Sequence, residues 1–95
     1  MKANAKRFAS VWDAIEDSPG EAEAMKLRTR LLRAVQKAIT DSGLSQGETA
    51  KLLRVTQPRV SDLMRGKIDL FSAETLIDML HAFGTTVKLS FKQAA

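Results

Sequence analysis

The side chains with the most distinctive chemistry in this sequence lie between residues 57 and 65. The Gln57 amide can bond adenine through two hydrogen bonds, and the Arg59 guanidinium can bond guanine in the same way. Asp62 can accept a hydrogen bond from the amino group of cytosine or orient Arg59. Pro58 offers only apolar contact, for which a thymine methyl group is suited. The residues predicted to contact DNA bases are Gln57, Pro58, Arg59, Ser61 and Asp62.

A second set of residues has the types that bind phosphate oxygens, contacts that fix the register of a protein on DNA without reading its sequence. Gln46 begins a predicted helix, where backbone N–H groups and the helix dipole favour an anion. The residues predicted to contact phosphate are Gln46, Arg54, Thr56, Arg65 and Lys67. Simpler readings stay open for two polar residues: Arg59 as a solvated arginine, and Asp62 as a partner of Arg65 on the helix surface.

Catalytic and metal-binding patterns are missing from the sequence. The chain has no Cys and one His, His81, which excludes a thiolate site and a multi-histidine site. Ser18, Ser45 and Ser72 fit helix caps better than nucleophiles, because no base accompanies them. We therefore expect a protein that is not an enzyme and that needs no cofactor.

Length and composition are those of one small domain. The chain has 95 residues and a net charge of +4, and its charged residues are clustered. It has no apolar run of the ~20 residues that a membrane span needs, and no apolar secretory signal. We expect a cytoplasmic protein, for which nucleic acid is an acceptable partner.

Short helices are the elements that must position these side chains. Apolar residues recur at helical spacing, and caps and glycines such as Ser18, Thr56, Ser72, Gly43 and Gly84 mark the ends. Ser45 and Glu48 form an S-x-x-E capping box. The pattern predicts helices over about residues 8–15, 19–42, 46–53, 57–65 and 73–83.

The two helices over 46–53 and 57–65 are joined by a turn of three residues, 54–56. Ala50 is small where the helices must approach each other, and Val60 and Leu63 face inward from the second helix. This pattern predicts a helix-turn-helix, in which the first helix braces the second against the major groove of DNA. The alternative is a purely structural pair of helices in a small bundle.

The end of the chain changes from helical to alternating periodicity. Val87, Leu89 and Phe91 alternate with polar residues, which predicts a β-strand. A single strand has unpaired backbone groups, so we expect it to pair with the same strand of a second copy in a two-fold dimer.

The run from Gln46 to Lys67 resembles the helix-turn-helix of the XRE family, the phage-repressor and Cro type, and its HigA-like antitoxin branch in particular. The resemblance extends over about residues 8–91. It implies an all-α, lambda-repressor-like bundle of about five helices with a short C-terminal β-strand. The expected parts are an arm and short helix (1–20), a DNA-binding domain (21–84) and a strand and tail (85–95). Arg54 departs from the family, which often has glycine there, and a left-handed backbone would cost an arginine about 1 kcal/mol.

The resemblance also implies a function. A HigA-like protein neutralises a RelE/HigB-like toxin and represses its own operon. With the helix-turn-helix and the paired tail strand, we expect a homodimer that binds a palindromic operator in the bacterial cytoplasm, at the nucleoid. Phe8 and Trp12 are candidate contacts with such a partner protein, or they complete the core. A stand-alone XRE-type regulator without a toxin is the alternative.

Overall fold

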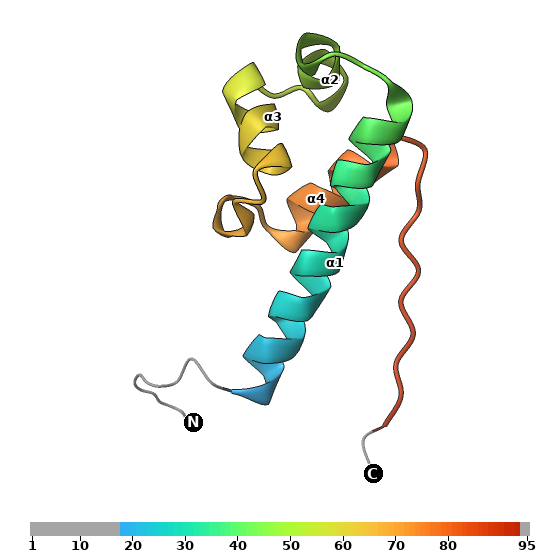
Figure 1. Cartoon of the computed structure of the whole chain (residues 1–95). Coiled ribbons are helices and arrows are strands. Elements are labelled where there is room, and N and C mark those ends of the chain that lie inside the picture. Colours follow the sequence, from blue (N-terminus) through green and yellow to red (C-terminus); the bar gives the residue numbers. More distant parts are fainter. Residues whose placement is uncertain (1–17, 94–95) are drawn as a thin grey trace.

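The computed structural model describes residues 18–93, which form four α-helices and one short 3-10 helix (Figure 1). In chain order these are α1 (Pro19–Ser42), α2 (Gln46–Leu53), α3 (Gln57–Met64), η3 (Ile68–Leu70) and α4 (Ala73–Ala82). The predicted all-α class is confirmed. The expected count of about five helices is corrected to four within residues 18–93, because the helix predicted over residues 8–15, with Phe8 and Trp12, lies outside the described residues.

The long helix α1 is defined by its two ends. The Ser18 hydroxyl accepts a hydrogen bond from the backbone N–H of Glu21 (3.0 Å), and Pro19 occupies the first turn, where its missing N–H does no harm. Gly43 ends the helix with φ of 70°, a left-handed conformation that glycine adopts without strain. The first turns of α1 are exposed and extend beyond the other helices (Figure 1).

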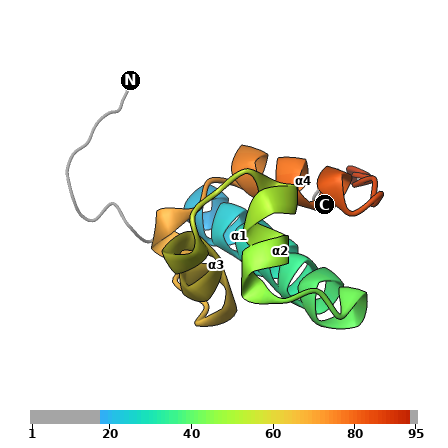
Figure 2. The same ribbon diagram turned by 90° about the horizontal axis from the view of Figure 1, so that it is seen from above.

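The core lies between the second half of α1, α4 and the inner face of α3. Helices α4 and α3 both pack against α1, and α2 packs against α3 and α4 (Figures 1 and 2). Leu63, Phe71 and Leu76 are the largest side chains with almost no exposed surface. Burial of each such side chain stabilises the fold by roughly 1.5–3 kcal/mol, so a small core suffices to fix the angle of α3. The buried cluster consists of Leu31, Leu32, Val35, Ile39, Leu63, Phe71, Leu76, Met79 and Leu80.

The predicted C-terminal strand is absent from the described residues. After Gly84 the chain runs on to residue 93 without regular secondary structure (Figure 1). Val87 packs against the core cluster, whereas Leu89 is 58% exposed and Phe91 is 92% exposed. The alternation of apolar residues predicted a strand, but a strand also needs a paired backbone, and the described part of this single chain offers none.

Among residues 18–93, no helix has the length and apolar character required to span a bilayer.

Candidate nucleic-acid interface

Helix α2 begins with the capping box that the sequence predicted. The Ser45 hydroxyl accepts from the backbone N–H of Glu48 (3.1 Å), and the Glu48 carboxylate accepts from the backbone N–H of Ser45 (2.9 Å). Each bond satisfies a backbone group that a helix end leaves without a partner. Ala50 is buried on the inner side of this helix, where a larger side chain would hold α2 away from its neighbours.

The turn after α2 passes through Arg54 in a left-handed conformation, with φ of 59° and ψ of 45°. This confirms that the position needs the backbone geometry that glycine adopts most readily, and the arginine costs about 1 kcal/mol there. The N–H groups of Arg54 and Val55 both bond carbonyl oxygens of the last turn of α2, and Val55 packs on the core. The turn is therefore tight and fixed at both ends.

Helix α3 is capped at its start and anchored at its end. The Thr56 hydroxyl accepts from the backbone N–H of Arg59 (3.3 Å). Val60 and Leu63 have no exposed surface, so one side of the helix is fully buried. The Gln36 side chain of α1 donates to the carbonyl oxygen of Leu63 (2.8 Å). This hydrogen bond fixes the last turn of α3 against α1.

The opposite side of α3 carries the residues predicted to contact bases. Gln57 and Pro58 are exposed, and Ser61 and Asp62 are half-buried. No other helix of residues 18–93 covers this side of α3 (Figures 1 and 2). The structure therefore places four of the five predicted residues on a helix face that a DNA groove can approach.

Arg59 is the predicted base-contacting residue that the structure uses internally. Its guanidinium donates to the carbonyl oxygen of Leu70 (2.9 Å) and lies over the ring of Phe71, 4.4 Å from the ring centre. A cation over an aromatic face is attracted by the electron-rich ring. Arg59 thus joins α3 to the segment that leads into α4, and a base contact requires it to leave these partners.

Asp62 pairs with the two basic residues that follow it, not with Arg59. Its carboxylate lies 3.7 Å from the Arg65 guanidinium and 3.6 Å from the Lys67 ammonium group. The simpler reading of Asp62 as a partner of Arg65 therefore fits the structure. Arg65 and Lys67 are still largely exposed, with 62% and 50% of their side-chain surface accessible. Exposed ion pairs of this kind are weak, so both cations can exchange the carboxylate for a phosphate.

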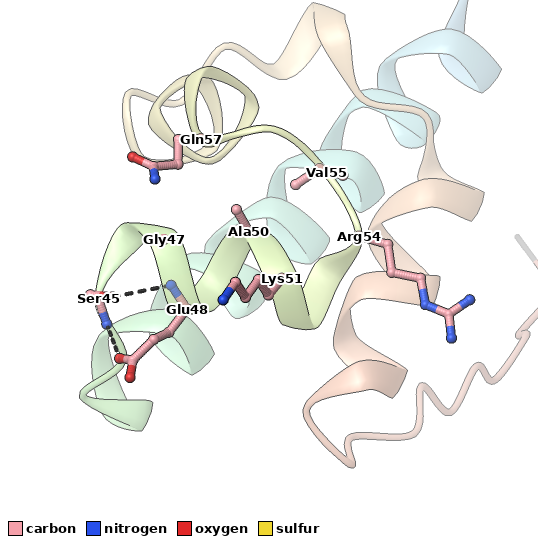
Figure 3. A pocket seen from close by; sticks show the side chains of 8 residues that line it. All are labelled: Ser45, Gly47, Glu48, Ala50, Lys51, Arg54, Val55 and Gln57. Atoms are coloured by element: carbon pink, nitrogen blue, oxygen red, sulfur yellow. Dashed lines mark hydrogen bonds between the residues drawn. The ribbon is translucent and has the colours of Figure 1, made fainter.

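An open hollow of about 590 Å³ lies where α2 meets the start of α3 (Figure 3). Its walls are made by Ser45, Gly47, Glu48, Ala50, Lys51, Arg54, Val55 and Gln57. The Gln57 amide lies at the end of the hollow near Ser45, and Arg54 lies at the other end with its guanidinium directed away (Figure 3). The structure does not bring these two side chains together.

The remaining predicted phosphate contacts have different surroundings. Gln46 is exposed as the first residue of α2, where helix N–H groups are available to an anion. Thr56 is exposed too, and its hydroxyl accepts the cap hydrogen bond while its proton stays available to donate to a phosphate. Gln46 begins α2 and Thr56 directly precedes α3, and the N-termini of these two helices border the hollow.

Three contacts that support the interface were missed by sequence reasoning. Gln36 bonds Leu63, Arg59 bonds Leu70, and the Gln57 amide lies where a Cβ at residue 47 would be 3.2 Å from it. One signal for the third was visible, because a glycine in the first turn of a helix is unfavourable without a reason. The other two join residues 27 and 11 positions apart, and no local pattern marks them.

Comparison with known proteins agrees with this geometry. A family model described as a helix-turn-helix domain matches residues 14–92. The chain belongs to the helix-turn-helix domain family. One solved structure, provisionally named an XRE family transcriptional regulator, is 32% identical and has a TM-score of 0.71. The match covers 78% of this chain and 83% of that protein. No curated protein matches the chain. Family and fold together support a DNA-binding transcriptional regulator of the XRE type.

Proposed function

We propose that this helix-turn-helix protein is a sequence-specific transcriptional regulator that binds a palindromic operator as a homodimer. The observation that carries the proposal is the uncovered polar face of α3, held at a fixed angle by α2, by Gln36 and by the core. A helix held in this way fits the major groove of B-DNA, and repression follows when the bound protein blocks a promoter.

In this proposal, residues on the uncovered face of α3 contact bases, and residues around that face contact phosphates. Gln57, Pro58, Ser61 and Asp62 face the base edges, and Arg59 joins them after it leaves Leu70. Gln46, Arg54, Thr56, Arg65 and Lys67 bind phosphates and set the register of the protein on DNA. The predicted phosphate contacts make binding weaken steeply as salt concentration rises, because bound counterions are released from the duplex.

The homodimer is proposed from the tail that follows α4. Leu89 and Phe91 expose apolar surface, and the backbone around them has no strand partner within residues 18–93. Pairing with the same segment of a second copy would bury the apolar side chains and give the backbone N–H and C=O groups hydrogen-bond partners. A two-fold dimer then places two α3 helices on half-sites about 34–36 Å apart, one helical turn of DNA.

The dimer proposal makes the change Leu89→Asp informative. Leu89 is 58% exposed in the single chain, so a charge there leaves the helical fold stable and disfavours only the paired tail. We expect a monomer in sedimentation and weaker operator binding, with an unchanged helical spectrum. A Leu89→Asp variant that still sediments as a dimer contradicts pairing through the tail.

The finer role that we propose is antitoxin and autorepressor of a HigBA-type toxin–antitoxin module in the bacterial cytoplasm, acting at the nucleoid. Its support is the resemblance of residues 8–91 to HigA-like proteins, and Phe8 and Trp12 are the proposed contacts with a RelE/HigB-like toxin. The alternative is a stand-alone XRE-type regulator. Co-purification of a small basic protein from the native host supports the antitoxin, whereas purification of the regulator alone supports the alternative.

Selection of bound sequences from a random pool of double-stranded DNA tests the central proposal. We expect a palindromic consensus with half-sites one helical turn apart. A consensus without symmetry contradicts the dimer but keeps DNA recognition. A pool with no enriched sequence contradicts the proposed function as a whole.

A further inference from the structure

Gly47 occupies a position where the backbone does not require glycine. Positive φ angles occur at Gly43, Gly66 and Gly84 among the described glycines, but not at Gly47. Gly47 is the second residue of α2, in a regular helical turn. Glycine is unfavourable in a helix, because its unfolded backbone has more freedom to lose. Its presence therefore calls for an explanation in the surroundings of the residue.

The surroundings of Gly47 are occupied by the side chain of Gln57. A Cβ atom added at Gly47 would lie 3.2 Å from the Gln57 amide nitrogen, closer than a comfortable van der Waals contact. Its next neighbours would be the amide carbon of Gln57 and the Ser45 hydroxyl, both at 3.9 Å. The missing Cβ thus leaves room for one group, the amide at the start of α3.

The Gln57 amide lies beside Gly47 without a hydrogen bond to the residues around the hollow. Among the residues that line it, the hydrogen bonds drawn join Ser45 and Glu48, and none reaches Gln57 (Figure 3). The surface of the first turn of α2 therefore limits how far the exposed amide can move toward α2. An amide that bonds adenine through both its N–H and its C=O must hold one orientation, since hydrogen bonds weaken steeply when they are misaligned.

We propose that Gly47 is a specificity-determining positioning residue, which seats the Gln57 amide against α2 in the orientation that reads one base pair. The inference rests on the proposed DNA-binding function and deepens it. Gly47 touches no base in this proposal. It acts through Gln57, and a methyl group at residue 47 displaces the amide by a few tenths of an ångström, which changes readout without unfolding the protein.

The chain supplies a matched control for this proposal. Gly20 is the second residue of α1, as Gly47 is of α2, and a Cβ added at Gly20 meets nothing within 4 Å. Gly47→Ala and Gly20→Ala therefore remove the same backbone freedom from the unfolded chain, but only the first touches Gln57. We expect both variants to raise the melting temperature by about 2–5 °C in thermal unfolding.

Sequence selection from a random DNA pool, followed by competition binding, separates the two variants. We expect Gly20→Ala to keep the wild-type preference at every position. Gln57→Ala is expected to lower the preference at one base pair of each half-site by roughly 5- to 100-fold. Gly47→Ala is expected to lower the preference at the same base pair by a smaller factor, about 3- to 10-fold. In the double variant, Gly47→Ala has no further effect at that position, because its effect acts through Gln57.

Three results overturn the role of Gly47. One is a Gly47→Ala variant with the wild-type preference at every base pair. Another is an equal loss at all positions or on random DNA. The third is an effect of Gly47→Ala that persists when Gln57 is alanine. A wild-type chain that enriches no sequence instead overturns the proposed function itself, together with the role of Gly47 that depends on it.

Discussion

The two ends of α3 present polar side chains under different constraints. At its start, Gln57 and Pro58 are exposed, and the residues around the hollow form no hydrogen bond with the Gln57 amide. At its end, Asp62 is shared by Arg65 and Lys67. A base can meet the first end without replacing any protein contact, whereas DNA at the second end must exchange one ion pair for another. We expect the strongest sequence readout from Gln57 at the start of α3, and salt-sensitive phosphate binding by Arg65 and Lys67 at its end.

Arg59 lies near the start of α3, but its side chain is bound to other parts of the protein, as the charged side chains at the end of α3 are. Its replacement is therefore expected to have the largest effect on both stability and readout. Arg59→Ala removes a charged hydrogen bond to Leu70 and the contact with Phe71. We expect a loss of about 1–3 kcal/mol in the free energy of unfolding, measured by urea denaturation. We also expect relaxed preference at one base position, measured in a selected DNA pool.

The variant Arg59→Lys keeps the charge and loses the planar fork. It should keep the affinity for random DNA while losing much of the stability and of the base preference. An unchanged unfolding free energy in Arg59→Ala contradicts an internal role for this side chain. An equal loss of affinity for specific and random DNA contradicts its base contact.

Thr49 is a buried residue of α2, the helix that supports α3. A substitution there tests the support of α3 without changing the side chains at either end of α3. The Thr49 side chain has no exposed surface, and its hydroxyl has no hydrogen-bond partner within residues 18–93. Thr49→Val replaces that hydroxyl with a methyl group of similar size. We expect the unfolding free energy to rise by about 1 kcal/mol, with operator preference unchanged, in thermal unfolding and binding assays. A destabilised Thr49→Val variant would indicate that the hydroxyl is satisfied in solution.

The smallest effect is expected at the paired end of α3. Asp62→Asn removes the carboxylate that holds Arg65 and Lys67, and these exposed pairs contribute at most about 0.5–1 kcal/mol to folding. Two cations then become available to phosphate. We expect about two- to fivefold tighter binding to random DNA at low salt, and a steeper dependence on salt concentration. Glu74→Gln on α4 removes the same charge away from α3, and an equal gain there contradicts a local effect.

Local patterns predicted the parts of the interface that depend on local chemistry. Ser45 with Glu48, Thr56 and Ser72 all cap helices as their spacing indicated. These features depend on neighbours within three or four residues, so the order of residues alone is informative about them.

Contacts between distant side chains could not be predicted in the same way. The bond from Gln36 to Leu63 and the seat of Arg59 on Phe71 depend on how the helices cross and on which rotamer fills the remaining space. The guanidinium of Arg59 was expected to face DNA, because its residue type suits guanine. The tail shows a similar limit: alternation at Val87, Leu89 and Phe91 describes two faces of a segment, but it does not decide whether the segment has a strand partner.

The exposed first turns of α1 form a surface that is separate from the candidate nucleic-acid interface. A helix of 24 residues is about 36 Å long, and its start projects away from α2 and the hollow (Figure 1). The tail runs toward that same end. The first turns of α1 and the end of the tail therefore lie on the side of the molecule away from α2 and the hollow. If the proposed function holds, we expect a partner bound there to change the number of subunits on DNA and not to occupy the face of α3 that reads bases.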